Sequence, residues 1–221
     1  MTMEALDRIR APKARRGFPG ALAPVVLLAL AGLAAGVAAK WLDVLALDDT
    51  VLWQAVLGRM DLRNVFSRPA AWAAMALPIA LFSRGPLRAG FHVLAFFAGM
   101  TAGYYMYTIA AAGFFPRQQI LLWSAVTLAT PLAGIAAWYA RGRGWPAALM
   151  GGLVLAFFLT QAFAWGRWYL DIRYPAELVC LALAALMLLR FRWEYAAALA
   201  AAMVLAPGLK LLLEAVLGLI L

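Results

Sequence analysis

The sequence predicts an all-α bundle of transmembrane helices, and three observations support that prediction. Of its 221 residues, 67% are hydrophobic and only 13% are charged, and the mean hydropathy is +0.86. A water-soluble domain could not cover that much apolar surface. The chain divides into seven apolar stretches joined mostly by short links, and the basic residues are distributed unequally between alternate links. We therefore expect a polytopic membrane protein.

Seven spans are expected, each close to the roughly 20 residues that cross about 30 Å of hydrocarbon. The second and sixth are the shortest, so a bundle of six spans stays open. Pro207 and Gly208 should kink the last stretch or separate an interfacial or re-entrant tail at 207–221. The spans are placed near 20–40, 67–83, 87–112, 118–140, 145–166, 174–190 and 194–221.

Basic residues predict the orientation, because Lys and Arg beside spans are retained on the cytoplasmic side. With the N-terminus inside, the inner segments hold eleven Lys or Arg and three acids, whereas the outer segments hold seven and six. Residues 1–19 would then be a basic cytoplasmic segment and 20–221 a single membrane domain. The inner basic residues should contact anionic headgroups. They lie on four separate links without a binding module, so no nucleic-acid partner is expected.

The long link at 41–66 should carry a short helix near 49–58. Asp48-Asp49-Thr50 can cap it, apolar residues from Val51 to Val56 recur at helical spacing, and Gly58 ends it. Such an amphipathic helix lies at the membrane interface, here the outer one. It would either tie two spans together or cover an outward pocket as a lid.

Small residues at four-residue spacing predict close helix packing. Gly32 with Gly36, and Gly99 with Gly103, each form a face that lets two helix backbones approach. Packing within the chain is favoured over dimerisation. Trp138 and Tyr139, beside the basic turn at 141–145, fit an aromatic anchor at the inner interface.

Polar side chains in or beside the apolar stretches are the candidate functional residues, because burying them in lipid is costly. In the predicted topology they gather at the outer ends of the first, fifth, sixth and seventh spans. Together they could form an outward-opening mouth for an ionic or zwitterionic molecule. Alternatively they extend to water and form ordinary interfacial ion pairs. The four-residue spacing of Lys210 and Glu214 is typical of such a pair on one helix face. These residues are Lys40, Asp43, Arg167, Asp171, Arg173, Glu177, Lys210 and Glu214.

Signatures of catalysis and of metal binding are missing from the sequence. There is no HExxH helix, GxSxG elbow or Gly-rich phosphate loop. His92 has no companion ligands nearby, which favours a packing role over a metal site, and no cofactor is implied. No histidine is expected at the depth of Ser67, Ser83 or Ser124, which disfavours a serine hydrolase. Cys180 stands alone, so an internal disulfide is excluded.

Four runs between residues 32 and 146 form a recognisable pattern. They are Gly36–Asp43, Asn64–Ser67 leading to Trp72, Ser83–Ala89 with Gly99-Met100 and Tyr104-Tyr105, and Trp138–Trp145. In these runs the chain resembles a family of small, uncharacterised bacterial multi-pass membrane proteins. The resemblance implies a bacterial inner-membrane protein of unknown activity, and it directs attention to Lys40, Asp43, Asn64 and Tyr104. The size and the Ala-rich first span resemble, less closely, the substrate-binding membrane subunits of energy-coupling-factor vitamin transporters.

These features predict a membrane protein that binds or transports a small polar or ionic solute through an outward-facing site. If it is a subunit of a larger transporter, another chain must supply the energy, because no nucleotide-binding signature is present. Two alternatives stay open. One is a non-catalytic scaffold or assembly factor. The other is a lipid-modifying enzyme, which would need a close pair of carboxylates, such as Asp171 and Glu177, facing a lipid-accessible groove.

Overall fold

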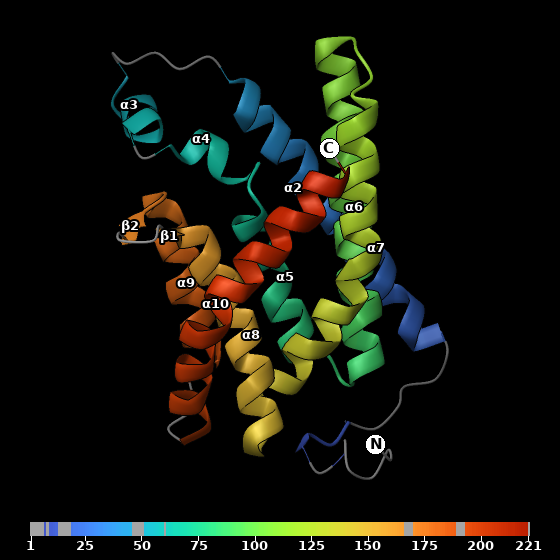
Figure 1. Cartoon of the computed structure of the whole chain (residues 1–221). Coiled ribbons are helices and arrows are strands. Elements are labelled where there is room, and N and C mark those ends of the chain that lie inside the picture. The colour runs from blue at the N-terminus through green and yellow to red at the C-terminus, as the bar shows by residue number, and fades with distance from the viewer. Residues whose placement is uncertain are drawn as a thin grey trace.

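Long apolar helices run side by side in alternating directions and form the body of the protein (Figure 1). The computed structural model describes residues 7, 9–12, 19–45, 51–59, 61–165, 170–188 and 193–220. The elements in chain order are α2 (Pro19–Val44), α3 (Leu52–Arg59), α4 (Leu62–Val65), α5 (Pro69–Phe82), α6 (Pro86–Ala112), α7 (Arg117–Ala140), α8 (Gly144–Ala162), β1 (Phe163–Trp165), β2 (Leu170–Ile172), α9 (Pro175–Leu188) and α10 (Trp193–Ile220).

Five of these helices are long and apolar enough to cross a membrane, so the described chain supports a multi-pass membrane protein. The candidate spans are Leu22–Val44, Pro86–Ala111, Arg117–Ala140, Gly144–Ala162 and Trp193–Ala215. The helices α5 and α9 are equally apolar but have 14 residues each, about 21 Å at 1.5 Å per residue. That length is below the hydrocarbon thickness of about 30 Å. Seven apolar helices therefore exist where seven were expected, while the count of seven full spans stays a prediction.

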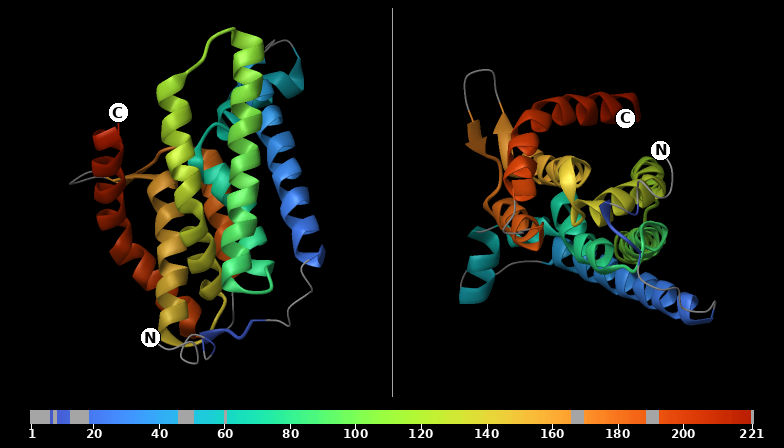
Figure 2. Two further views of the ribbon diagram at one scale, coloured as in Figure 1. Left: turned by 90° about the vertical axis from the view of Figure 1, so that its right-hand side faces the viewer. Right: turned by 90° about the horizontal axis from the view of Figure 1, so that it is seen from below.

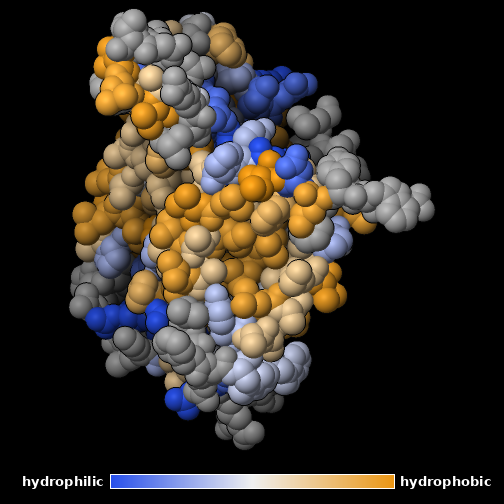
Figure 3. Space-filling model, turned by 90° about the vertical axis from the view of Figure 1, so that its left-hand side faces the viewer, coloured by the Kyte–Doolittle hydropathy of each residue, from blue (hydrophilic) through white to orange (hydrophobic). Residues whose placement is uncertain are grey.

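The surface has the hydrophobic belt of a membrane protein. Figure 3 shows a broad hydrophobic band across one face, with hydrophilic residues above and below it. Large apolar side chains such as Leu128, Leu132 and Val204 are among the most exposed. In water this exposure would be unfavourable, whereas in a bilayer these side chains meet lipid tails.

Helix boundaries agree with the sequence-based expectation except at the links. The fifth span ends at Ala162 rather than near 166, because the chain enters an antiparallel hairpin that pairs Phe163 with Ile172. The helix expected near 49–58 is α3, and its cap at 48–50 lies outside the described residues. The single turn α4 was not expected. Its preceding residue, Asp61, adopts a left-handed conformation with φ 52°.

The Gly motifs of α2 and α6 pack against each other within the chain, as expected. A Cβ added at Gly36 would lie 2.1 Å from the Met100 carbonyl oxygen, and one at Gly99 would lie 2.0 Å from the Ala29 carbonyl oxygen. Gly32 and Gly103 are equally tight. Real Cβ contacts are never this close, so only glycine permits the contact. The exposed helix α2 is thereby held on α6.

One end of the bundle, here called the Arg10 end, is closed by an N-terminal strap of residues 9–12. The Arg10 guanidinium donates to the Trp138 carbonyl and, over 2.8 Å, to the Leu81 carbonyl, and it stacks 4.2 Å above the Trp138 ring. The backbone N–H of Arg143 donates to the Ile9 carbonyl at 2.8 Å. Trp138 is only 1% exposed. The expectation that it anchors at the interface was therefore wrong, because its ring fills the core beneath Arg10.

Helix α10 continues through Pro207 and curves along its length (Figure 2). Proline lacks an N–H and removes one helical hydrogen bond, so the expected kink becomes a bend rather than a break. The first half packs on α8, where Gly152 would clash with the Ala201 side chain if it carried a Cβ. The distal half turns across the bundle.

We expect Gly36→Leu to destabilise the protein by about 1–3 kcal/mol, because the new side chain must push α2 away from the α6 backbone. Thermal unfolding in detergent measures the change. Ala34→Leu is the matched control on the exposed face of α2 and should change stability by less than about 0.5 kcal/mol. Equal effects of the two substitutions would contradict the proposed packing.

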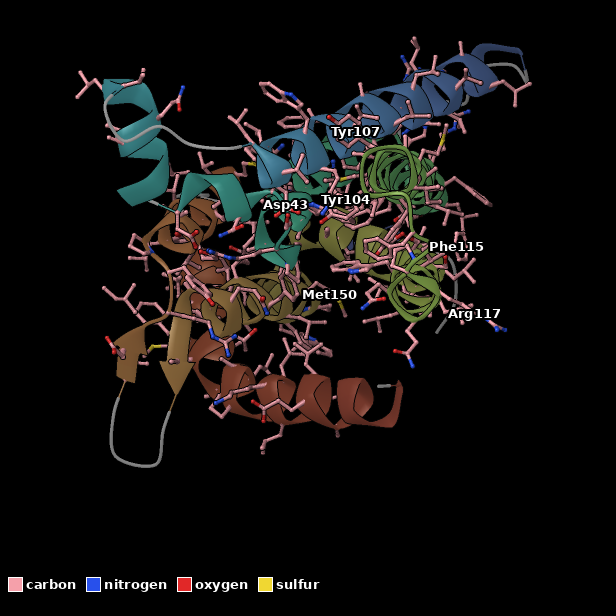
Figure 4. The ribbon with its side chains drawn as sticks, turned by 90° about the horizontal axis from the view of Figure 1, so that it is seen from above. Asp43, Tyr104, Tyr107, Phe115, Arg117 and Met150 are labelled. Atoms are coloured by element: carbon pink, nitrogen blue, oxygen red, sulfur yellow. The ribbon has the colours of Figure 1, made fainter. Side chains whose placement is uncertain are left out.

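Orientation is testable with single cysteines in a Cys180→Ala background. Phe115, in the link between α6 and α7 (Figure 4), and Arg143, at the Arg10 end, are both exposed. If the Arg10 end faces the cytoplasm, Phe115→Cys reacts with a membrane-impermeant maleimide in intact cells, whereas Arg143→Cys reacts only after permeabilisation. The reverse pattern would refute an N-terminus inside.

Candidate functional site

The first polar cluster joins the end of α2 to α6. The Lys40 ammonium lies 2.5 Å from an Asp43 carboxylate oxygen, and the Tyr104 hydroxyl donates to the same oxygen at 3.4 Å. Lys40 also lies 5.2 Å from the centre of the Tyr104 ring. Figure 4 shows Asp43 and Tyr104 next to each other when the molecule is viewed from the end opposite Arg10. Three of the candidate residues thus meet.

The second polar cluster centres on Arg68, the residue before α5. Its guanidinium donates to both oxygens of Glu177, at 3.0 and 3.1 Å, and pairs with Asp61. The same guanidinium stacks 3.6 Å above the Tyr174 ring. Asn64 donates to Asp61 at 2.6 Å. Two candidates, Asn64 and Glu177, are therefore linked through Asp61 and Arg68, which were counted only as charges of the outer segments.

Burial makes the Arg68–Glu177 pair structurally important. The Glu177 side chain is 3% exposed and the Arg68 side chain 16%. A charge in so dry a site is tolerated only when it is paired and hydrogen-bonded. The pair also joins the start of α5 to the first turn of α9, where the helix dipole favours a carboxylate. It holds two short helices together at their N-terminal ends.

Trp72 lies between the two clusters. Its ring is 5.9 Å from Tyr104 of the first cluster, and its indole N–H donates to the Phe66 carbonyl, two residues before Arg68. Tyr104 is eight residues from the end of α6, so the first cluster lies about 12 Å below that helix end. The two clusters and Trp72 together are here called the polar layer.

Four candidates lie outside this layer. Asp171 and Arg173 are exposed on and after β2, and the Asp171 carboxylate accepts its neighbour's backbone N–H at 2.8 Å. Lys210 and Glu214 form the expected ion pair at 3.8 Å on the distal half of α10. Arg167 lies outside the described residues. The contacts described above thus join five of the candidates in two clusters and leave these four outside them, and the single mouth built from all the candidates stays a prediction.

An apolar cavity of about 370 Å³ lies among α5, α6, α7, α8 and α10. Its walls are alanine, glycine, branched aliphatic and aromatic side chains, and Thr130, its one hydroxyl, donates to the Thr127 carbonyl at 2.7 Å. None of the candidate residues lines it. Pro69 and Trp123 line the end nearest the polar layer. Pro69 directly follows Arg68, and Trp123 stacks 4.8 Å from Trp72. The cavity thus begins at the polar layer.

Ser83 and His92 form a hydroxyl–imidazole pair at the Arg10 end. The Ser83 oxygen lies 3.0 Å from His92 Nδ1, so the expectation that Ser83 has no histidine at its depth was wrong. The turn between α5 and α6 folds the two residues together. The Ser83 hydroxyl also donates to the Ile79 carbonyl at 2.7 Å, which leaves His92 to donate to Ser83. This arrangement caps α5 and does not activate a nucleophile. No group of metal ligands occurs among the described residues.

Sequence reasoning missed the residues at the centre of the polar layer. Arg68 and Asp61 were counted only among the charges of the outer segments, and Tyr174 was not considered. One available signal was Arg68 immediately before Pro69, because a residue before proline is extended and its side chain cannot join a helix face. The other was Glu177 within an apolar helix, which requires a nearby cation.

No family model, curated protein or solved structure matches this chain. The resemblance to uncharacterised bacterial membrane proteins therefore stays an expectation, and the site must be interpreted from its own geometry.

We expect Arg68→Met to destabilise the protein by about 3–5 kcal/mol, because it leaves the buried Glu177 carboxylate unpaired. The double variant with Glu177→Leu should recover most of that loss, since no buried charge then remains without a partner. Chemical unfolding in mixed micelles measures both. Lys210→Met is the control, and its exposed partner Glu214 limits the effect to about 0.5 kcal/mol. Additive losses in the double variant would contradict the coupling.

Proposed function

We propose that this membrane protein binds an amphipathic small molecule, with its polar end at the polar layer and its hydrocarbon part in the cavity. The observation behind the proposal is the direct junction of the two, where Arg68 belongs to the polar layer and Pro69 lines the cavity. A cavity of about 370 Å³ is also within the range of about 300–1,000 Å³ typical of small-molecule sites.

The cavity walls favour an amphipathic ligand over the ionic solute expected from the sequence. An ion entering this space would lose its hydration and meet only apolar side chains and one hydroxyl that is already bonded. A hydrocarbon tail loses nothing there, because its surroundings in the bilayer are equally apolar. The cavity therefore suits the tail, and the polar group must remain at the layer above it.

The polar layer suits an uncharged or zwitterionic group. Lys40 is paired with Asp43, and Arg68 is paired with Glu177 and Asp61, so neither cation is left to neutralise an anionic ligand. The clusters instead present mixed donors and acceptors. Such surroundings bind polar groups through hydrogen bonds and local dipoles rather than through net charge.

The surroundings of Asp171 and Glu177 do not favour the carboxylate pair that a lipid-modifying enzyme would need. Asp171 is exposed on the hairpin, and Glu177 is held by Arg68. Neither lines the cavity. Binding is therefore the activity that the geometry supports, and the bacterial cytoplasmic membrane is the compartment that we propose from the resemblance. A role as a subunit of a larger transporter would use the same site for ligand capture.

Filling the cavity should abolish binding. Ala133→Phe places a ring in the cavity, so labelling of α5 and α7 by a diazirine-bearing phospholipid should fall at least fivefold in nanodiscs, as measured by mass spectrometry of the labelled peptides. Ala125→Phe, on an exposed face of the same helix, should leave that labelling unchanged. Wild-type labelling that is confined to the outer faces of α2 and α10 would refute ligand binding and favour a scaffold.

A further inference from the structure

On the basis of the proposed function, we propose that the hydrocarbon part of the ligand is one unbranched chain of about 13–17 carbons, which enters sideways from the bilayer. The shape of the cavity, the composition of its walls, its closed end and its exposed side each support a part of this assignment.

The width of the cavity admits one chain. Its lining runs from Pro69 to Ala80 on α5 and from Trp123 to Ala137 on α7, which is about 16 and 21 Å at 1.5 Å per residue. A volume of about 370 Å³ over that length corresponds to a cylinder about 5 Å wide for the centres of the atoms inside it. Carbon atoms in contact are about 3.5–4.0 Å apart. One extended chain therefore fits along the cavity with its carbons close to the walls.

Small residues make the cavity continuous along its length. Ala73, Ala76 and Ala80 recur on one face of α5, and Ala133, Gly134 and Ala137 face them from α7. Gly134 must be small for a second reason, since a Cβ there would lie 3.0 Å from the Ala89 carbonyl oxygen. The larger lining side chains on these two helices are Leu77, Trp123 and Val126. The walls are thus apolar along both helices and suit an unbranched hydrocarbon chain.

The Arg10 strap closes the far end and limits the length of the chain. Ala80 and Ala137 are the last lining residues of their helices. The residues that follow them, Leu81 and Trp138, are 0% and 1% exposed, and Arg10 bonds both of their carbonyls. A carbon–carbon bond of about 1.52 Å at an angle near 111° advances an extended chain by about 1.25 Å. The 16–21 Å available therefore holds about 13–17 carbons.

The chain can enter from the side, between α7 and α10. Val126, Ala129 and Ala133 line the cavity and are exposed, so no other described part of the chain covers them. Across from them, Leu209 of the distal half of α10 completes the lining. Figure 2 shows this half of α10 turned across the bundle rather than aligned with α7. A bilayer lipid can therefore insert one chain without leaving the hydrocarbon layer.

Competition by lipids of graded length tests this assignment. The full-length protein in nanodiscs is labelled with a diazirine-bearing C16 chain, and lysophosphatidylcholines of 10 to 20 carbons compete. We expect the half-inhibitory concentration to fall with each two carbons up to about 16, and to rise at least threefold by 20. Ala80→Phe should shift the optimum about four carbons shorter. The matched control, Ala98→Phe on an exposed position of α6, should not shift it.

The outcomes separate this inference from the proposed function. Two outcomes would overturn the single-chain assignment while leaving ligand binding intact. One is competition that is equally strong at every chain length, and the other is stronger competition by a sterol, or by a two-chain lipid with both chains in the cavity. A wild-type protein that is not labelled on α5 or α7 by any of these probes would overturn both. If the Ala80→Phe variant does not fold, Ala137→Leu shortens the cavity at the same closed end, and this variant must also favour shorter chains.

Discussion

The buried contact between Arg68 and Glu177 determines how the two short helices are placed. Each helix has 14 residues and cannot reach across the hydrocarbon layer by itself. At their N-terminal ends, the Glu177 carboxylate is 3% exposed and the Arg68 side chain 16%, so these charges are largely removed from water. A shared, hydrogen-bonded ion pair is one of few ways to stabilise such ends. Asp61 and Tyr174 complete the surroundings of the guanidinium, and the polar layer follows from these contacts.

The cavity is a consequence of the same arrangement. Alanine on the face of α5 towards α7 leaves space that the neighbouring helices do not fill. Close approach is instead achieved elsewhere, between α2 and α6, where glycine backbones touch. A core of this size would normally be filled by larger side chains. An apolar space that is left open to lipid, beside a polar layer, is consistent with an amphipathic occupant.

Hydropathy predicted the helices well, because each must bury or expose apolar surface over a length fixed by the bilayer. It could not predict which charges meet. Lys40, Asp43 and Tyr104 were identified as candidates and do meet, whereas Arg68 was counted only as a charge of the outer segments, because a sequence does not show which distant carboxylate a guanidinium will reach. The contact between His92 and Ser83 was also missed. The two residues are nine positions apart in the sequence, and the turn between α5 and α6 brings them within hydrogen-bond distance. Spacing within one helix, as for Lys210 and Glu214, was readable directly.

The cavity lay beyond sequence reasoning because alanine has no distinctive pattern in an Ala-rich chain. The sequence does not distinguish an alanine that faces lipid from one that faces a helix or an empty space. The distance between the helix axes determines which of these surroundings the alanine has. That separation is set by a few contacts distant from the cavity, namely the Arg68 pair at one end and the two carbonyls held by Arg10 at the other. With both ends of α5 fixed by guanidinium groups, the space between is maintained by polar contacts that no apolar ligand would disturb. Binding a chain would then require little rearrangement of the bundle, which lowers the entropy lost on association.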